Sequence, residues 1–428
     1  MFVNANYTRH ISKPQELIIS KSNIVQFLQM AVLLLFVSHD AFSYINAGAS
    51  IIVAYYGLLI MLLTSICVLQ APNQHSVMRT TYRWWGIGAM VFVCLYLLRV
   101  LYDLYVVNVP FLLVSNRNTI PFLFICIAIM PLLMLPFMDF KLVDWSLFTK
   151  LCYLLFSGMG LYSVYLNISG QLIGSILSDG RMMGNANMDT IGFGHLGVII
   201  ILTSIAIVHD KNFVWKLAGI CTLILGTGII FGAGSRGPMI ALVVCMLVLL
   251  YAKGYRMLAI LFIPILLMAF YLMFPLLNDF FVGQGNYAIE RIYDSVFRAD
   301  EMKDVTSYRD MLYKEMFSAY MESPITGIGF LLHDGQYVHN VIFESFMAVG
   351  LLGGILFLGL ITYALYAAIT IIRQNECFVF VALLYIQQLV YGLFSRSLSI
   401  LPVFWFSMYL VIGIYFTNVP PKFKYVRA

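Results

Sequence analysis

Long runs of apolar residues recur along almost the whole chain, and they limit the folds that it can adopt. Most runs hold about 17–25 residues, the length at which an α-helix crosses the hydrocarbon core of a bilayer. A soluble fold would need polar side chains to coat these runs, but only 11% of the 428 residues are charged, against roughly 25% in an ordinary soluble domain. The sequence therefore predicts an all-α integral membrane protein with about twelve transmembrane helices. The spans are expected at residues 24–42, 49–70, 85–107, 119–136, 147–166, 191–208, 214–232, 238–252, 257–275, 341–366, 377–394 and 401–417.

Basic residues indicate how these spans are oriented. If the N-terminus lies in the cytoplasm, the short outer loops hold only Arg117, Arg181, Arg236 and Arg396. The inner segments then hold many more: Arg9, Lys13, Lys21, Arg79, Arg83, Lys141, Lys150, Lys211, Lys216, Lys253, Arg256, Arg373, Lys422, Lys424 and Arg427. This asymmetry follows the positive-inside rule and predicts that both termini are cytoplasmic.

One outer loop is much longer than the others, and it divides the chain into three parts. Residues 1–275 are predicted to hold spans one to nine, residues 276–340 the large loop, and residues 341–428 the last three spans and a cytoplasmic tail. Apolar residues at helical spacing over 289–297 and a capping-box pattern at 307–310 predict two amphipathic helices in the loop. The loop is therefore expected to form a small helical cap against the membrane.

The seven cysteines do not have the pattern of a disulfide framework or a metal site. No C-x-x-C motif and no His/Cys ligand spacing occurs. Each cysteine lies inside or at the edge of an apolar run: Cys67, Cys94, Cys126, Cys152, Cys221, Cys245 and Cys377. They are interpreted as small packing residues, and no metal or other cofactor is expected.

Two helix starts on the outer face could bind phosphate. Pro238 suits the first turn of a helix, so Arg236 is expected at the positive end of the eighth span. Asn340 is a good N-cap, so His339 is expected at the positive end of the tenth span. A helix N-terminus beside a guanidinium favours phosphate oxygens, and a diphosphate leaving group needs this neutralisation as its bond breaks.

Simpler interpretations stand beside this one. Arg117 and Arg396 are most simply interfacial anchors, and a lone histidine at a helix start is often only a cap or a surface residue. Arg99 and Asp103, four residues apart, are expected to form an ion pair inside the third span. Glu344 is either a second acid/base candidate or the partner of an arginine.

Several short motifs resemble the O-antigen ligase and polymerase superfamily. One is the Gly-Ser-Arg-Gly-Pro segment at residues 234–238, which leads into an apolar run. Another is residues 323–329, followed by His339, Asn340, Glu344, Gly350, Gly353 and Gly354. The segment that holds Arg181, Gly184, Asn185 and Asn187 resembles a third family block, although it reads Asn-Ala-Asn where an Asn-Pro-Asn-like turn is expected. The order of the motifs and the late outer loop agree with the family over the whole chain.

The resemblance implies a class C-like membrane glycosyltransferase that acts at the periplasmic face of the bacterial inner membrane. Its donor would be an undecaprenyl-diphosphate-linked glycan, with no metal and no nucleotide sugar. Arg181, Arg236 and Arg309 would then bind the diphosphate, and His339 would take the proton from the acceptor hydroxyl in an inverting attack. Expected partners are the lipid-linked oligosaccharide, membrane lipid and a chain-length regulator protein, but no nucleic acid.

Two activities compete within the superfamily. A polymerase joins O-antigen repeat units while they are lipid-linked, and a ligase transfers finished O-antigen to lipid A–core. The polymerase is favoured on the unusual sequence between the motifs and on the content of 27 tyrosines and 33 phenylalanines. A secondary transporter or glycan flippase is a less favoured alternative, because the sequence shows no repeated halves.

Overall fold

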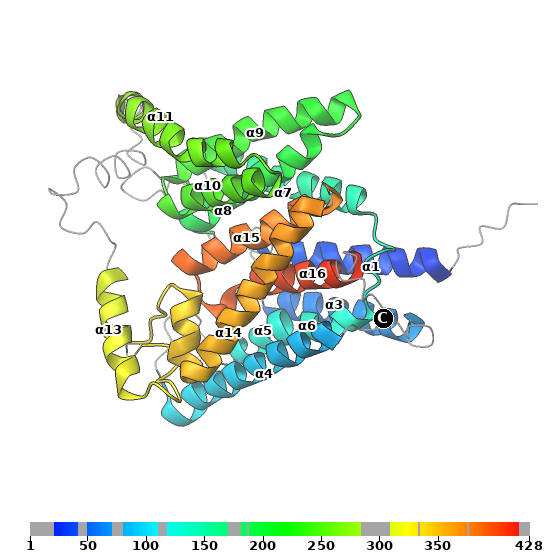
Figure 1. The fold of residues 1–428 in the computed structure, drawn as a ribbon, viewed down its shortest axis with the longest axis vertical. Coiled ribbons are helices and arrows are strands. Elements are labelled where there is room, and N and C mark those ends of the chain that lie inside the picture. The colour runs from blue at the N-terminus through cyan, green and yellow to red at the C-terminus, as the bar shows by residue number, and fades with distance from the viewer. Residues whose placement is uncertain are drawn as a thin grey trace, which may run out of the picture.

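The computed structural model describes residues 21–41, 49–70, 80–109, 118–169, 181–185, 188–283, 309–332, 334–374 and 376–418. Within these ranges the chain is all-helical, with no strand beyond an isolated bridge between Asn185 and Met188 (Figure 1). Helical structure covers all or most of each of the twelve ranges predicted as spans. The elements are α1 (Lys21–Val37), η1 (Ser38–Ala41), α3 (Ala49–Gln70), α4 (Thr80–Tyr102), η2 (Asp103–Val107), α5 (Thr119–Phe124), η3 (Ile125–Ile129), α6 (Met130–Met134), η4 (Leu135–Phe137), α7 (Trp145–Ile168), α8 (Thr190–Val208), α9 (Phe213–Ala233), α10 (Arg236–Ala252), α11 (Arg256–Gly283), α13 (Arg309–Glu322), α14 (Val341–Gln374), η6 (Glu376–Phe378), α15 (Val379–Phe394), η7 (Leu398–Ile400) and α16 (Pro402–Asn418).

Part of this helical set meets the length and hydropathy required of a membrane span. Among the described residues six stretches do so: Arg83–Val107, Trp145–Ile168, Thr190–Val208, Phe213–Ala233, Val341–Gln374 and Glu376–Phe394. Five further apolar helices are shorter: Asn23–Val37, Ala54–Leu69, Thr119–Met134, Arg236–Ala252 and Pro402–Thr417. The prediction of an all-helical chain is confirmed for the described residues, among which six helical stretches are long and apolar enough to cross a membrane.

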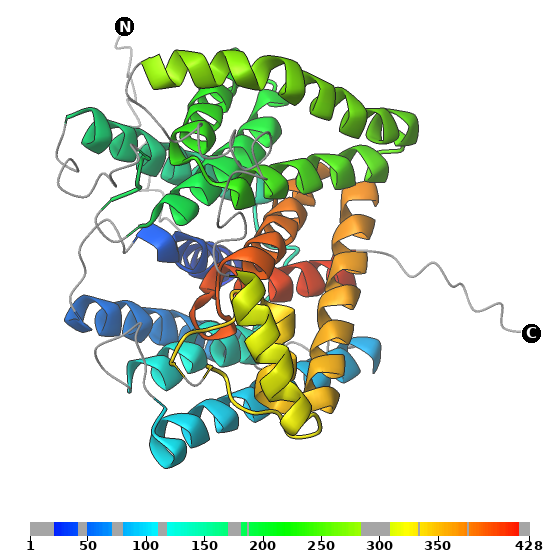
Figure 2. The ribbon, with the colours of Figure 1, turned by 90° about the vertical axis from the view of Figure 1, so that its left-hand side faces the viewer.

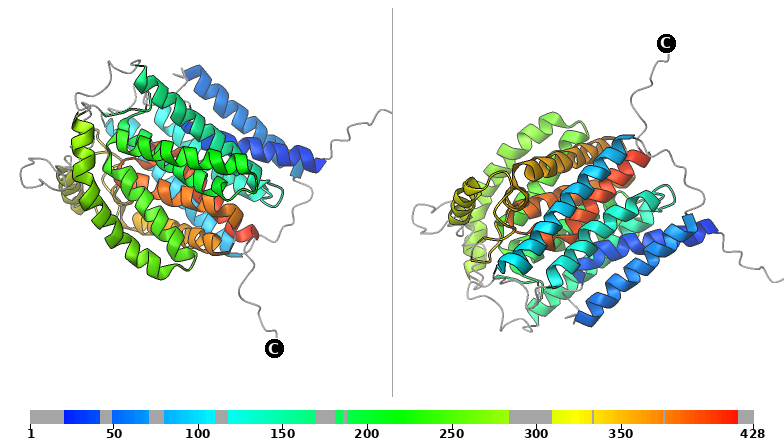
Figure 3. Two further views of the ribbon diagram at one scale, coloured as in Figure 1. Left: turned by 90° about the horizontal axis from the view of Figure 1, so that it is seen from above. Right: turned by 90° about the horizontal axis from the view of Figure 1, so that it is seen from below.

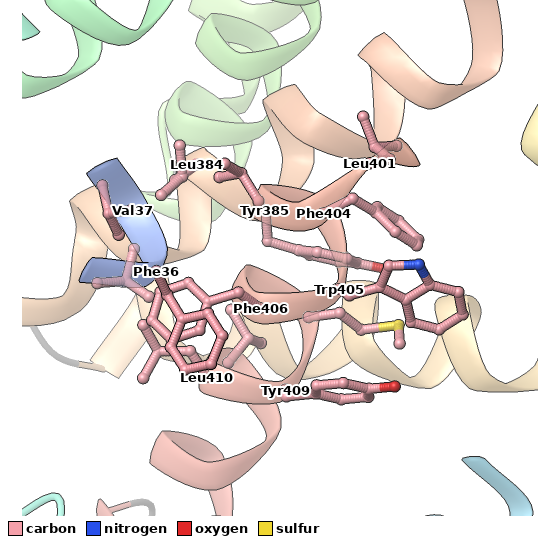
Figure 4. Close-up of a cluster of buried hydrophobic side chains, with 14 of the residues drawn as sticks. Phe36, Val37, Leu384, Tyr385, Leu401, Phe404, Trp405, Phe406, Tyr409 and Leu410 are labelled. Atoms are coloured by element: carbon pink, nitrogen blue, oxygen red, sulfur yellow. The ribbon is translucent and has the colours of Figure 1, made fainter. Parts of the chain in front are cut away.

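The helices form three neighbouring groups, with α14, α15 and α16 between the others. Helices α7 to α11 lie on one side of this central group, α3 to α6 lie on the other, and α1 lies beside α16 (Figure 1). Trp405 of α16 is fully buried, and aromatic rings from α4, α5 and α14 surround it. Figure 4 shows side chains of α1, α15 and α16 packed together in this buried core. The packing fixes α15 and α16, and with them the loop that joins them.

Helix α14 is interrupted at Gly350, and the interruption anchors a loop. The backbone of Gly350 has φ 73° and ψ −170°, a conformation that is essentially restricted to glycine. The Met347 carbonyl released there accepts the backbone N–H groups of Ile328 and Gly329 at 2.8 and 3.2 Å, and Leu351 N–H donates to the Pro324 carbonyl at 2.8 Å. Residues 324–329 are therefore joined to the helix by backbone hydrogen bonds.

The predicted pair of Arg99 and Asp103 is confirmed, and it holds the same loop. Arg99 Nε lies 2.9 Å from Asp103 Oδ1. The second carboxylate oxygen of Asp103 accepts the backbone N–H of Phe330 at 2.8 Å. An ion pair on α4 and η2 thus also fixes the segment that leads towards His339.

The long outer loop is described only in part. Helix α11 continues to Gly283, past the boundary expected at residue 275. The helix predicted from the capping box appears as α13, with Leu312, Met316 and Ala319 buried, and it ends just before Ser323 and Pro324. The apolar stripe at 289–297 lies outside the described residues.

The two ends of the bundle are distinct. At the end that we call the site end, α8, α10 and α14 begin and α15 terminates, and α13 lies there in front of α14 and α15 (Figure 2). The start of α1 and the last turn of α16 are both at the opposite end (Figure 3). The described residues at the two chain ends are therefore on one side of the bundle.

Candidate functional site

The candidate site is built where three helix N-termini meet the loop at residues 395–397. Asp189 caps α8 by accepting Gly192 N–H at 2.7 Å. Ser235 precedes α10, whose first turn contains Pro238 as predicted. The starts of α8 and α10 touch, since a Cβ placed on Gly194 would lie 2.5 Å from Cγ of Pro238. The dipoles of α8 and α10 thus point their positive ends at the same region, beside the loop at residues 395–397.

Helix α14 completes this arrangement through Asn340, which is its N-cap as predicted. Its side-chain oxygen accepts the backbone N–H groups of Ile342 and Phe343 at 3.0 and 3.1 Å. Its amide nitrogen donates to the Leu393 carbonyl at 3.2 Å. Asn340 therefore joins the start of α14 to the last turn of α15.

His339 adopts a strained backbone and a defined tautomer. Its φ of 58° lies in the left-handed region, which costs a residue other than glycine about 1–3 kcal/mol. Nδ1 lies 3.5 Å from the Ser395 carbonyl. Because a carbonyl can only accept, Nδ1 carries the proton in the neutral ring, and the lone pair is on Nε2. The ring also packs at 4.2 Å on that of Tyr337.

The surroundings of His339 favour its neutral form. Burial lowers the pKa of the imidazole below its ordinary value, and the Ser395 carbonyl opposes this shift. The guanidinium charges of Arg309 and Arg396 lower the pKa further. A neutral imidazole with its lone pair on Nε2 is the form that a general base requires.

The predicted arginines are placed at the same end of the bundle. Arg236 is the first residue of α10, and Arg181 donates to the Thr190 hydroxyl at 3.4 Å, beside the start of α8. The segment after Arg181 is tied down by Met182 N–H, which donates to the Gly232 carbonyl at 2.9 Å. Arg309 begins α13, and its charge acts on His339. Asn187 and Arg117 lie outside the described residues.

Glu344 is buried one turn into α14, and its carboxylate is surrounded by donors. Oε1 accepts the hydroxyls of Tyr96 and of Ser397, the latter at 2.7 Å. The Leu398 N–H lies 3.2 and 3.1 Å from the two carboxylate oxygens. These partners are hydroxyls and a backbone amide rather than the arginine that the sequence suggested as an alternative. The carboxylate therefore fixes the loop at residues 395–397.

Arg396 occupies the centre of the site, although the sequence suggested only an interfacial anchor. Its Nε donates to the Tyr391 hydroxyl at 2.6 Å, and its guanidinium lies 5.3 Å from the centre of that ring. Its Nη2 is 3.9 Å from Asp189 Oδ1, and its side chain is 31% exposed. An anchor would extend into the interface, whereas this side chain is held over the starts of the helices.

His195 was also missed by the sequence reasoning. It lies in the second turn of α8, is 2% exposed, and stacks on Tyr391 at 3.9 Å. The available signal was an ionisable residue inside an apolar span, which often marks a functional site. Metal binding has no support in the described residues, where no group of three or more histidine, cysteine, aspartate or glutamate side chains is suitably arranged.

The comparison with known families fits this geometry. Residues 221–358 match the family model described as O-antigen ligase. The matched range contains Arg236, Arg309, His339 and Glu344, and it ends before Arg396. The resemblance inferred from the motifs is thereby confirmed, and the match is consistent with the O-antigen polymerase and ligase superfamily. No curated protein matches the chain significantly.

The family match and the apolar helices together characterise the protein in broad terms. Members of this family are glycosyltransferase-like enzymes. Taken together, the helices that could cross a bilayer and the O-antigen ligase match suggest a bacterial membrane protein of lipopolysaccharide biosynthesis.

Proposed function

We propose that the chain is an O-antigen polymerase, which joins undecaprenyl-diphosphate-linked oligosaccharide units at the periplasmic face of the inner membrane. One observation carries this proposal. Three helix N-termini, several arginines and a neutral histidine meet at one end of an apolar bundle whose residues 221–358 match the O-antigen ligase family. This combination suits a lipid-linked, doubly charged donor.

The proposed topology has twelve spans, a class C-like architecture and cytoplasmic termini. Its support is that helices cover all or most of each of the twelve predicted ranges and that the start of α1 and the last turn of α16 lie at the same end of the bundle (Figure 3). The end opposite the site also carries many of the described basic residues, among them Lys150, Lys211 and Lys253. The positive-inside rule would place that end in the cytoplasm and the site in the periplasm.

In the proposed reaction the anomeric carbon of the donor sugar loses its bond to the diphosphate oxygen. Arg181, Arg236 and Arg309, together with the starts of α8 and α10, would stabilise the negative charge that develops on the leaving diphosphate. A guanidinium can contact two phosphate oxygens at once, which suits this role better than an ammonium group.

The acceptor hydroxyl would be activated by His339. Nε2 takes the hydroxyl proton while the oxygen attacks the anomeric carbon from the face opposite the diphosphate, so the configuration inverts. Glu344 is proposed as a positioning residue, because its oxygens already accept from Tyr96, Ser397 and Leu398. It would hold the loop against which His339 rests.

An O-antigen ligase is the second candidate, and the description of the matched family favours it. Both enzymes use the same donor, so the arginines do not distinguish them. They differ in the acceptor, which is another lipid-linked unit for the polymerase and lipid A–core for the ligase. A chain-length regulator would be a partner of the polymerase alone.

Deletion of the gene followed by gel analysis of the surface polysaccharide separates these candidates. Loss of a polymerase leaves lipid A–core with a single repeat unit, because the separate ligase still works. Loss of the ligase leaves bare lipid A–core while long polymer collects on the carrier lipid. We expect the first pattern. Bare core without any polymer would instead indicate a flippase and contradict the proposal.

A further inference from the structure

A small cavity lies behind Arg396, between the first turns of α8, the end of α15 and the start of α16. Its volume is about 210 Å³. Much of its wall is apolar, but five side chains with polar atoms also line it: His39, His195, Gln388, Tyr391 and Arg396. The apolar residues of the wall include Leu196, Ile199, Leu401, Pro402 and Val403. A wall of this kind excludes water and strengthens any charge interaction inside.

A chain of buried side chains fixes the proton on His195. Gln388 Nε2 donates to Gln387 Oε1 at 2.9 Å, and Gln387 Nε2 lies 2.8 Å from His195 Nδ1. An amide nitrogen can only donate, so Nδ1 must accept. The proton of the neutral imidazole is therefore on Nε2. Both glutamines are buried, at 0% and 2% exposed.

The N–H of His195 Nε2 is a buried donor without a hydrogen-bond partner among the described residues. The side chain is 2% exposed, and a Cβ placed on Gly237 would lie 3.7 Å from Nε2. Buried donors are nearly always paired in folded proteins, so an unpaired one calls for a ligand or another explanation. The glutamine chain shows that the donor is specifically oriented.

Tyr391 places this donor next to the guanidinium of Arg396. The imidazole of His195 stacks on the Tyr391 ring at 3.9 Å, and Arg396 lies 5.3 Å from the centre of the same ring. The neighbouring carboxylate of Asp189 is 57% exposed and 3.9 Å from Nη2, too far for a close ion pair. Arg396, His195 and Gly192 in the first turn of α8 therefore line a single cavity.

We propose that His195 and Arg396 form an oxyanion subsite that binds one phosphate group of a membrane-bound isoprenyl diphosphate. Each phosphate of a sugar-linked isoprenyl diphosphate carries one negative charge, which the single guanidinium matches. The His195 N–H donates to a phosphate oxygen, and the apolar wall accepts the adjoining hydrocarbon. The inference rests on the proposed function, and it adds a subsite inside the bundle, behind the arginines at its surface.

The test measures binding of farnesyl diphosphate to the purified full-length protein by equilibrium dialysis. His195→Leu removes the donor while keeping an apolar side chain, and Arg396→Gln removes the charge. Each is expected to weaken binding about ten- to hundredfold, the range for a hydrogen bond to a charged group. His195→Gln is expected to retain most of the binding, because its amide nitrogen reaches the position of Nε2. The matched control is His209→Leu, at the other end of α8, with unchanged binding.

Two further probes identify the ligand. Inorganic pyrophosphate should lose affinity in the same variants, whereas phosphatidylglycerol should bind each of them as it binds the wild-type protein. If the variants lost affinity for phosphatidylglycerol alone, the subsite would be assigned to a phospholipid headgroup and the proposal would be overturned. Equal binding of farnesyl diphosphate by wild-type protein and His195→Leu, with both folded by circular dichroism, would also overturn it.

The subsite and the proposed function can fail separately. If wild-type protein forms new glycosidic product but His195→Leu binds the diphosphate normally, only the subsite is wrong. If no product forms but binding still depends on His195, the subsite stands and the glycosyltransferase assignment fails. If His195→Leu does not fold, the comparison of Arg396→Gln with wild-type protein decides whether the subsite holds the diphosphate.

Discussion

Replacing Glu344 tests whether this carboxylate positions the site or performs chemistry. In Glu344→Ala the Tyr96 hydroxyl and the Leu398 N–H lose their acceptor, whereas Ser397 can still bond Ser399, whose hydroxyl lies 2.9 Å away. A buried donor left unpaired costs about 1–3 kcal/mol. For two donors the free energy of unfolding should therefore fall by about 2–6 kcal/mol, which overlaps the range of about 3–5 kcal/mol for breaking a buried charge interaction.

Glu344→Gln provides the sharper comparison, because it keeps one acceptor oxygen and the shape of the side chain. Its free energy of unfolding should fall by about 1–2 kcal/mol, and part of the activity should remain. Denaturant titration of the purified protein in mild detergent, followed by circular dichroism, gives the stabilities. Glu322→Ala on the exposed face of α13 is the control and should change stability by less than about 0.5 kcal/mol. Glu344→Gln with wild-type stability and no activity would identify the carboxylate as the base and refute the positioning role.

Three further results are expected. Burial lowers the pKa of His339, and protonation would inactivate a base. The acidic limb of the pH profile of kcat/KM should therefore lie below pH 6.5, the ordinary pKa of histidine. An acidic limb above pH 6.5 would contradict the assignment of His339 as the base. Arg236→Ala should abolish activity at normal expression, and Arg236→Lys should restore it only partly, because lysine cannot donate to two phosphate oxygens in the planar geometry of a guanidinium. Full activity of Arg236→Ala would show that Arg236 is only an interfacial anchor. In a cysteine-free background, Lys314→Cys should react with a membrane-impermeant thiol reagent in outer-membrane-permeabilised cells and Lys253→Cys should not, and the reverse labelling would overturn the proposed orientation.

Local sequence patterns predicted the features that depend on neighbours along the chain. The helices follow from the length of the apolar runs, although α11 and α14 each continue eight residues past the predicted end. The N-cap of Asn340 and the first-turn position of Pro238 depend only on the backbone of one helix. The pair of Arg99 and Asp103 likewise follows from helical spacing.

Features made by distant segments were not predictable in this way. A glycine is required at position 350 because a Cβ there would lie 2.0 Å from the Ile325 carbonyl oxygen, and no local pattern pairs these two residues. The hydrogen bond between His195 and Gln387 joins residues 192 positions apart. Arg396 resembled the other arginines at membrane boundaries until the fold placed it beside α8. A single sequence gives helix positions, but the contacts between helices decide which polar residues meet.

The most direct test of the account is glycosyl transfer by the purified protein. Wild-type protein in lipid nanodiscs is mixed with lipid-linked repeat units, and the products are separated by mass. We expect lipid-linked oligomers of two or more units with an inverted new linkage, and His339→Ala should slow their formation about 10²–10⁴-fold, the usual cost of losing a general base. The central claim would be contradicted if wild-type protein left the lipid-linked repeat units unchanged although donor and acceptor were both present. It would also be contradicted if wild-type protein and His339→Ala formed product at the same rate.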